Sequence, residues 1–361
     1  MKYTNIFIKN FRGIQALEIQ DCKQVNLLVG RNNCGKTSIL EALFLLSGMS
    51  NPQLMLNIHL FRDLMLTEEE GFNYPFYNLD TQNTPEISAT VQGTKEKKRA
   101  LKITPLYGDY ISAGEKKLKK VNLSGSANID SKQPTNLELS GSTATFQRIE
   151  GLKFDFGHEN GKKGWHTELL FKEPEFRLAK DYKEHLRGVF LNPRTMMADL
   201  DARLGHLLVQ KNLGKVIAVL QEIEPSIVDI RMGPNKMIYV DIGLDKLWPL
   251  NIMGDGIRRI LAILAAIYNS PKGVLLLDEI ENGLHYASLT TLWKAVFQAA
   301  QEFDTQIFAT THSYECIESF ANTGYEDFRF YRIDRTSGSH TAYSAVPEVL
   351  RVGIEKAFEV R

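Results

Sequence analysis

The stretch LLVGRNNCGKTSILEAL, which runs from Leu27 to Leu43, decides the fold of this 361-residue chain. An apolar run leads into a loop between Gly30 and Gly35, and a lysine, two hydroxyl residues and a helical apolar pattern follow. This is the full spacing of a P-loop between a strand and a helix, which is the setting that the motif requires. The pattern therefore predicts a nucleotide site built on an α/β core.

Each position of this loop has a predicted role. Glycines let the backbone fold tightly so that its N–H groups point at phosphates, and the helix that follows adds the positive end of its dipole. We expect Lys36 on the β- and γ-phosphates, Thr37 on Mg²⁺ and Ser38 near the α-phosphate. The predicted nucleotide-binding residues of the loop are Gly30, Asn32, Asn33, Cys34, Gly35, Lys36, Thr37 and Ser38. The alternative is a glycine-rich turn that only joins a strand to a helix.

A second apolar run, from Val274 to Leu277, ends in two acids. Asp278 at the strand end is predicted to hold Mg²⁺ together with Thr37, and Glu279 to polarise the attacking water. Acids also cap ordinary strands, so it is their pairing with the P-loop that indicates chemistry. His312 follows a further apolar run and is placed to reach a γ-phosphate, although a lone histidine is usually structural. The predicted catalytic residues are therefore Lys36, Glu279 and His312.

A glycine turn opens a predicted helix about twenty residues before the acids, at Gly254, Asp255 and Gly256. Free N–H groups at a helix start bind anions. This turn cannot easily reach a nucleotide on the P-loop of the same chain, so its natural ligand is the γ-phosphate held by a second subunit. The alternative is an ordinary N-cap, in which the Asp255 side chain starts a core helix.

The chain divides into four predicted segments. Residues 1–85 form an N-terminal ATPase lobe, and residues 86–174 a β-rich insertion of antiparallel hairpins with disorder around Asn122 to Ser142. Residues 175–235 form a helical subdomain, which we expect to be mostly helical from Glu175 to Glu224. Residues 236–361 form a C-terminal ATPase lobe, where strands and helices alternate as in an α/β core.

Composition limits the partners and the location. Lys plus Arg and Asp plus Glu both number 43, so any nucleic-acid contact must be a local patch. The apolar runs are far shorter than the ~20 residues that cross a bilayer, and we expect no membrane partner. The three cysteines have neither CxxC spacing nor an even count, which fits a reducing compartment and a cytoplasmic protein.

The order of P-loop, glycine turn, acidic strand and histidine resembles the ABC-type ATPases, and more narrowly their SMC/RecF/OLD-like branch, often described as AAA family ATPases. The resemblance covers roughly residues 1 to 60 and 245 to 320. The motifs that carry it are Ile8–Gly13, Gly30–Ser38, Met253–Arg259, Asp278–His285 and Thr310–Ser313. The implied fold is α/β, a P-loop NTPase of ABC-ATPase type with an antiparallel β-rich subdomain and a helical insertion.

The resemblance implies a homodimer of heads, arranged head to tail, with ATP and Mg²⁺ held between the P-loop of one copy and the glycine turn of the other. It implies that Arg12 lies near the nucleotide and that Asn282–His285 crosses the dimer seam. Two departures suggest slow or partner-dependent hydrolysis. Gly254 stands where the branch commonly has a serine, and no glutamine that reports the γ-phosphate can be placed.

The chain is also expected to act without a fused effector. Only 241 positions separate Thr37 from Asp278, too few for long coiled-coil arms, and only 49 residues follow His312, too few for the nuclease domain of the OLD type. We therefore expect an ATP-driven switch whose effector is a separate protein, in a setting such as bacterial anti-phage defence. GTP is not expected, since Asn235–Ile238 lacks the acid that would read guanine.

Two other functions compete. One is a RecF-like DNA-binding ATPase for repair or maintenance, with Lys95–Arg99 and Lys116–Lys120 on the DNA phosphates. Both basic runs contain or adjoin a glutamate and lack interleaved aromatic residues, as solvated hairpins do. The other is the nucleotide-binding subunit of a transporter, which the Phe11–Gly13 opening and the long insertion disfavour.

Overall fold

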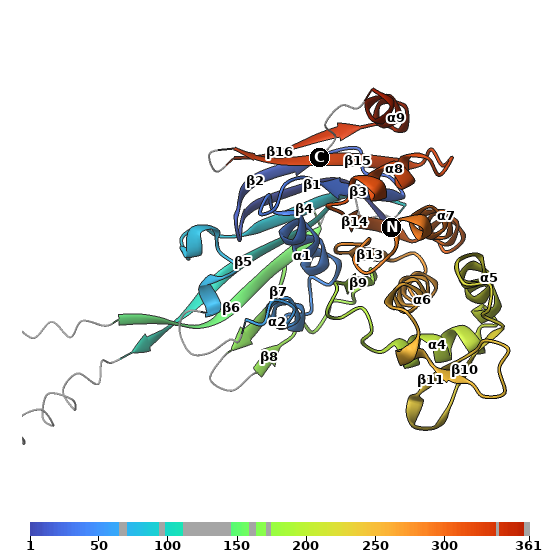
Figure 1. The fold of residues 1–361 in the computed structure, drawn as a ribbon. Helices are drawn as coiled ribbons and strands as arrows, with labels where there is room; N and C mark the ends of the chain where they lie inside the picture. The colour runs from blue at the N-terminus through green and yellow to red at the C-terminus, as the bar shows by residue number, and fades with distance from the viewer. Residues whose placement is uncertain are drawn as a thin grey trace, which may run out of the picture.

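The computed structural model describes residues 1–64, 71–93, 98–110, 146–158, 164–170, 175–336 and 339–356, and Figure 1 shows their arrangement. The elements of the first half are β1 (Lys2–Phe11), β2 (Ile14–Ile19), β3 (Val25–Val29), α1 (Lys36–Ser47), α2 (Gln53–Leu60), β4 (Glu86–Gln92), β5 (Lys98–Tyr110), β6 (Phe146–His158), β7 (Trp165–Leu170) and β8 (Glu175–Arg177). The elements of the second half are β9 (Gly188–Leu191), α4 (Leu200–Val209), α5 (Leu213–Ile223), β10 (Asp229–Met232), β11 (Ile238–Asp241), β12 (Trp248–Pro249), α6 (Asp255–Tyr268), β13 (Val274–Leu277), α7 (Tyr286–Glu302), β14 (Gln306–Thr310), α8 (Tyr314–Ala321), β15 (Phe328–Thr336), β16 (Ser339–Ala345) and α9 (Pro347–Glu355).

The core is a six-stranded sheet in the order β16-β15-β3-β14-β13-β9. All neighbouring pairs are parallel except β15 and β16. Every residue of β3, β13 and β14 is buried, as expected where helices or a second sheet cover both faces. Since β3, β13 and β14 are parallel, their carboxyl ends meet at one edge of the sheet, and the P-loop, the acids and His312 follow those ends.

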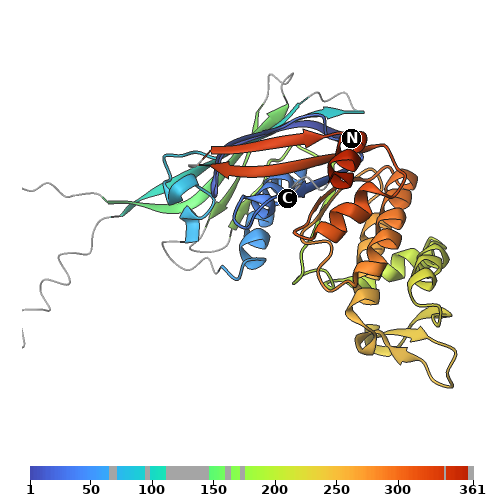
Figure 2. The same ribbon diagram turned by 45° about the horizontal axis from the view of Figure 1, so that its top comes forward.

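A second sheet covers one side of this core. Its seven antiparallel strands run in the order β2-β1-β4-β5-β6-β7-β8. Its buried face joins one hydrophobic cluster with α1 and with alternate residues of the core sheet, such as Leu28, Leu276 and Phe308. Helix α1 therefore lies between the two sheets, and all its residues except Thr37 are buried. The β15–β16 hairpin runs along β2 in both views (Figures 1 and 2).

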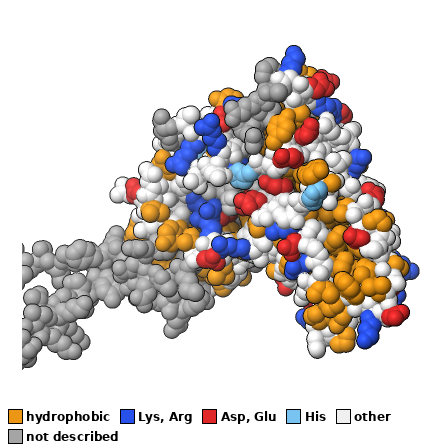
Figure 3. All heavy atoms as spheres, viewed as in Figure 1, with side chains coloured by type: hydrophobic (Ala, Val, Ile, Leu, Met, Phe, Trp, Pro, Cys, Tyr) orange, Lys and Arg blue, Asp and Glu red, His pale blue; other side chains and the backbone are white. Residues whose placement is uncertain are grey.

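Helices cover the opposite face of the core sheet. Helices α6, α7 and α8 share a hydrophobic cluster with the other residues of the strands, including Leu27, Leu275 and Ile307. Helices α4 and α5 and the small sheet β10-β11-β12 form a lobe at the far end (Figure 1). Hydrophobic side chains gather on the surface of this lobe (Figure 3). They include Leu208, Val209, Val228, Met232, Leu244, Trp248 and Ile252.

Most of the predicted core elements are confirmed. The strands at residues 25–29, 274–277 and 306–309, the helices that follow the P-loop and the glycine turn, and the antiparallel hairpins of the insertion are all present. The α/β P-loop fold with a β-rich subdomain is therefore correct. The disorder expected around Asn122 to Ser142 lies outside the described residues.

The prediction for residues 175–235 is partly wrong. This range was expected to be a helical subdomain, but it is helical only within Leu200–Ile223. Residues Glu175–Arg177 form the edge strand β8, and Gly188–Leu191 form β9, which pairs in parallel with the strand of the acids. A four-residue strand has too few positions to show a period, and its placement depends on a partner that is distant in sequence.

No helix in the described ranges is long and apolar enough to cross a membrane.

Candidate nucleotide site

The P-loop has a backbone that favours glycine at two positions. Gly30 has φ +143°, and a Cβ there would lie 2.3 Å from the carbonyl oxygen of Ile333 and 2.8 Å from the sulfur of Cys34. Gly35 has φ +93° and is the N-cap of α1, where its carbonyl accepts the N–H of Ile39 at 2.9 Å. These are left-handed conformations that favour glycine. The loop is therefore shaped before a ligand arrives.

Lys36 is folded back over its own loop. Its residue is 6% exposed, and its Nζ donates to the carbonyl oxygens of Gly30 at 2.8 Å and Arg31 at 3.0 Å. The same nitrogen lies 3.4 Å from Nδ1 of His312, so the structure brings these two predicted catalytic residues together. Burial lowers the pKa of Lys36, and a phosphate in the loop would stabilise its charge.

The predicted metal ligands also meet. The hydroxyl of Thr37 donates to both carboxylate oxygens of Asp278, at 3.2 and 3.0 Å, and the hydroxyl of Thr310 donates to Oδ1 at 2.7 Å. Burial raises the pKa of Asp278, because the site disfavours an uncompensated carboxylate. A hydroxyl and a carboxylate at this spacing are oxygen ligands that suit Mg²⁺. In the described part of the chain, no group of three or more His, Cys, Asp or Glu could hold a metal.

Glu279 stands at a strained position directly after the strand. Its φ is +50°, and its N–H donates to the hydroxyl of Thr310 at 2.8 Å. A non-glycine residue in this region costs about 1–3 kcal/mol and persists only where surrounding contacts hold it. The turn separates the Glu279 side chain from that of Asp278, and Oε2 of Glu279 accepts from Asn282 at 3.3 Å. The first acid thus stays in the core, while the second is held by the loop that follows it.

Two further residues of the site, Thr310 and Glu281, lie within motifs that the sequence shares with the family, but the sequence assigned no role to either. Thr310 joins the two acids, as described above, from the end of the neighbouring strand. Glu281 accepts the N–H of His312 through Oε1 at 2.8 Å and keeps its buried Oε2 without a partner. Both were missed because a threonine at a strand end and one acid among several look ordinary. Only the strand order, which places β14 beside β13, reveals them.

Arg12 lies at the turn between β1 and β2, but its side chain pairs with helix α1. Its Nε lies 2.7 Å from Oε2 of Glu41, which is 1% exposed. Arg62 donates to the same carboxylate at 2.6 and 3.1 Å. Nη2 of Arg12 is buried without a hydrogen bond, and burial lowers the pKa of the guanidinium. Contact between Arg12 and a nucleotide therefore remains a prediction.

The glycine turn makes its hydrogen bonds within its own helix and not with the P-loop among the described residues. The N-cap of α6 is Gly254, and the side chain of Asp255 does not cap the helix but accepts from Arg258 at 3.0 Å. A Cβ on Gly256 would lie 3.5 Å from the Leu284 side chain, so the turn adjoins the loop that follows the acids. Across the described ranges, no hydrogen bond or ion pair joins Gly254, Asp255 or Gly256 to the P-loop.

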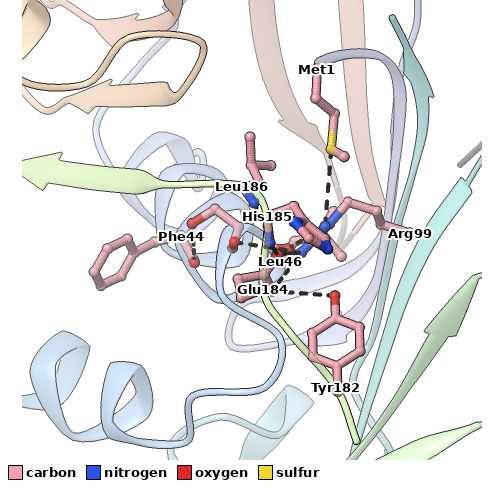
Figure 4. A network of polar contacts seen from close by, with 9 residues as sticks. Met1, Phe44, Leu46, Arg99, Tyr182, Glu184, His185 and Leu186 are labelled. Carbon is pink, nitrogen blue, oxygen red and sulfur yellow. Dashed lines mark hydrogen bonds and ion pairs between the residues drawn. The ribbon is translucent and has the colours of Figure 1, made fainter. Parts of the chain in front are cut away.

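Arg99, expected to lie on a DNA-facing basic run, is instead fully buried at 0% exposure. It donates to both carboxylate oxygens of Glu184 at 2.8 Å and to the carbonyl oxygen of Leu46 at 3.2 Å (Figure 4). It therefore ties the antiparallel sheet to the end of the P-loop helix, and its assignment to DNA is wrong. Lys95 and Lys116–Lys120 lie outside the described residues.

Comparisons with known proteins place relatives beside this chain. A family model described as "AAA ATPase domain" matches residues 1–157, and one described as "AAA domain, putative AbiEii toxin, Type IV TA system" matches residues 142–318. An ATP/GTP phosphatase of Helicobacter pylori is 23% identical over 326 residues, which cover 87% of this chain and 86% of that protein. The DNA replication and repair protein RecF of Francisella tularensis subsp. novicida is 25% identical over 355 residues, which cover 90% and 98%.

Among solved structures, the SMC head bound to the C-winged helix domain of ScpA aligns with 96% of this chain and 98% of that chain, at a TM-score of 0.49 and 12% sequence identity. A likeness of this degree is too low to carry a conclusion by itself. The two family models, which together run from residue 1 to residue 318, and the two long relatives are the findings that matter.

Proposed function

The chain belongs to the SMC/RecF-like branch of the ABC-type ATPases, and from this premise we propose that two copies bind two ATP molecules head to tail and thereby control a partner. One observation carries the proposal. The P-loop is preorganised and its helix is enclosed, whereas the Gly254 turn is exposed and is bonded to none of the P-loop residues among those described. A second copy would supply the missing half.

The residues divide the chemistry among them. Lys36 would hold the β- and γ-phosphates, and Thr37 and Asp278 would hold Mg²⁺, which supplies charge neutralisation when bound. Glu279 would accept a proton from the water that attacks the γ-phosphorus, while the bond to the ADP oxygen breaks. His312, seated by Glu281, would donate to a γ-phosphate oxygen. The products are ADP and phosphate.

Hydrolysis in this scheme is slow or dependent on a partner. Gly254 has no side chain to reach the γ-phosphate, so only backbone N–H groups would bind it from the second copy. The Glu279 carboxylate is also held by Asn282 and must be released to meet a water. A contact that moves the Asn282 loop would therefore raise the rate.

The partner is proposed to be a separate effector protein. The exposed hydrophobic side chains of the helical lobe support a contact with another protein chain, since exposed apolar patches mark such surfaces. The name of the second family model, with its toxin–antitoxin reference, supports a role in bacterial defence. Pull-down of the tagged chain with and without ATP, followed by identification of proteins retained only with ATP, tests for this effector.

The dimer itself is tested by the Glu279→Gln variant. Loss of the general base should lower hydrolysis by at least about 10²-fold while ATP binding stays intact. The variant should therefore accumulate as a dimer in ATP and remain monomeric in ADP, as measured by light scattering. Glu302→Gln, on the far end of α7, is the matched control and should behave as the wild type. Hydrolysis by Glu279→Gln at the wild-type rate would show that the base is another residue.

A second candidate function is DNA binding, which the long alignment with RecF favours. Binding through phosphates would weaken steeply as salt rises. A fluorescent duplex titrated at two salt concentrations, with and without ATP, measures this dependence. The absence of binding at low salt removes the candidate.

A further inference from the structure

A cavity of about 270 Å³ lies at the edge of the core sheet opposite the P-loop. The residue before β9, one face of α4 and the end of α6 form its walls. The polar side chains that line it are those of Arg187, Asp199, Arg203, His206, Asn269 and Ser270. Its volume is below the range of about 300–1,000 Å³ that is usual for drug-sized ligands, so the cavity suits a small ion or metabolite.

The strand pairing separates this cavity from the nucleotide site. Arg187 comes directly before β9, and its carbonyl oxygen accepts the N–H of Val274, the first residue of β13, at 2.9 Å. The two strands are parallel, so Arg187 lies at their amino ends, whereas Asp278 follows the carboxyl end of β13. The four steps from Val274 to Asp278, at about 3.3 Å each, place about 13 Å between the two edges.

Two arginines of the cavity have no acidic partner. Within the described ranges, no ion pair joins Arg187 or Arg203 to a carboxylate, and the one hydrogen bond from either guanidinium runs from Nη1 of Arg203 to the carbonyl oxygen of Met196 at 3.5 Å. Burial lowers the pKa of Arg203, Asp199 raises it, and the charge of Arg187 lowers it further. An anion between the two arginines would stabilise both charges.

Helix α4 holds its part of the wall against α6. Asp199, Arg203 and His206 recur at the spacing of one helix face. The side chain of Asn269, the C-cap residue of α6, donates through Nδ2 to the carbonyl oxygens of Arg203 at 2.9 Å and Ala265 at 2.7 Å. The backbone of Arg203 is therefore fixed, while its guanidinium keeps donors for a ligand.

Ser270 supplies a further donor directly after α6. The residue is fully buried at 0% exposure, and its Oγ has no hydrogen-bond partner among the described residues. A buried hydroxyl without a partner is costly, and a ligand that accepts its hydrogen bond recovers that cost. Donors from three different elements suit the tetrahedral oxygens of a phosphate better than a planar carboxylate, which one arginine fork can satisfy.

We propose that this cavity is a second ligand site, which binds a phosphate group as inorganic phosphate or as the phosphate end of a small phosphomonoester. Arg187 binds the group from the core sheet, Arg203 from α4, and Ser270 from the end of α6. Because α4 belongs to the helical lobe and β9 to the core, the bound group also ties the lobe to the core. The site does not use the P-loop and is independent of the proposed ATP switch.

The test titrates inorganic phosphate by calorimetry into the full chain saturated with ADP and Mg²⁺, so that the P-loop is already occupied. Arg187→Gln and Arg203→Gln should each weaken phosphate binding by at least about tenfold, the effect of a lost charged hydrogen bond, and Ser270→Ala by about threefold. Arg231→Gln, on β10 of the same lobe where Arg231 pairs with Asp229, is the matched control and should leave the affinity unchanged.

The same titration of Lys36→Ala without nucleotide separates this site from the P-loop. The affinity for phosphate should stay at the value of the ADP-saturated chain. Loss of phosphate binding in Lys36→Ala would assign the ion to the P-loop and overturn the second site. Unchanged affinity in both Arg187→Gln and Arg203→Gln, or an equal loss in the control Arg231→Gln, would overturn it as well.

Glycerol 3-phosphate, titrated in the same way, distinguishes the two sources of the phosphate group. Binding tighter than that of inorganic phosphate assigns the site to a phosphomonoester, and weaker binding assigns it to the free ion; either result supports the site. Absence of saturable binding of both compounds would overturn it. Failure of the dimer proposal is a separate result, because it appears as ATP binding without an ATP-dependent change in mass.

Discussion

The P-loop and the Gly254 turn are both glycine-rich starts of helices, but they differ in how far the rest of the fold encloses them. Helix α1 is enclosed between two sheets, and Lys36 at its first position is bonded to the loop itself. Helix α6 begins at the surface, where Gly254 and Asp255 are exposed and the side chain of Asp255 is bonded only within its own helix.

The difference indicates which ligand each helix start is suited to bind. A preorganised loop with its lysine and hydroxyls in place is complete toward a triphosphate, because the positions of its N–H groups are already fixed. An exposed helix start with no side-chain cap presents N–H groups whose anion must come from outside the chain. The first half should therefore control binding, and the second half should control association.

Lys36→Ala is expected to have the largest effect, because it removes the ammonium group that the P-loop holds over its own backbone and that is predicted to bind the β- and γ-phosphates. ATP binding measured by calorimetry should fall below detection, and both dimerisation and hydrolysis should be lost with it. Lys9→Ala, on an exposed position of β1, is the control. Retention of tight ATP binding by Lys36→Ala would contradict the assignment of Lys36 and the P-loop to the phosphates of ATP.

Gly254→Asp is expected to abolish ATP-dependent dimerisation without affecting ATP binding. The backbone at Gly254 has φ −57°, and a Cβ there meets nothing within 4 Å, so the fold should accept the change. The new carboxylate should repel the γ-phosphate of the other copy. ATP binding should stay near the wild-type level, while the ATP-dependent dimer disappears in light scattering and hydrolysis falls by at least about tenfold, from the loss of about 1.4 kcal/mol or more.

Gly254→Ala is the matched control for this prediction, since it adds a Cβ without charge and should keep the dimer. An equal loss of dimer in both variants would mean that the turn acts through its shape. A normal dimer in Gly254→Asp would remove the turn from the interface.

Asp278→Asn should have the smallest effect of these variants. In the absence of ligand, it should slightly raise the thermal stability of the folded protein. The pKa of Asp278 is raised in the folded state, so the folded protein binds more protons than the unfolded chain and its stability falls as pH rises above the usual range of an aspartate. Removing the charge should raise Tm near neutral pH by about 2 °C for each 1 kcal/mol recovered. Calorimetry at several pH values checks whether the gain vanishes in acid; a lower Tm at neutral pH would contradict it.

Sequence alone predicts the buried half of the site better than its surroundings. Gly30–Ser38 and Asp278–Glu279 are local sequence patterns, and their spacing is enough to predict a phosphate-binding loop and a strand that ends in two acids. Thr310, Glu281 and the pairing of Glu41 with Arg12 and Arg62 depend on which strands and helices become neighbours, which no local period encodes. The β15–β16 hairpin shows the same limit, because it contacts the P-loop from about 300 residues further along the chain.

The central claim is that one site is made by two copies, and mixing two inactive variants tests it most directly. Lys36→Ala has an intact glycine turn, and Gly254→Asp has an intact P-loop. In a mixed dimer, one of the two composite sites regains both intact halves. The account predicts that the mixture hydrolyses ATP faster than the sum of the two variants measured separately. A rate equal to that sum, under conditions where the wild type dimerises, would contradict it.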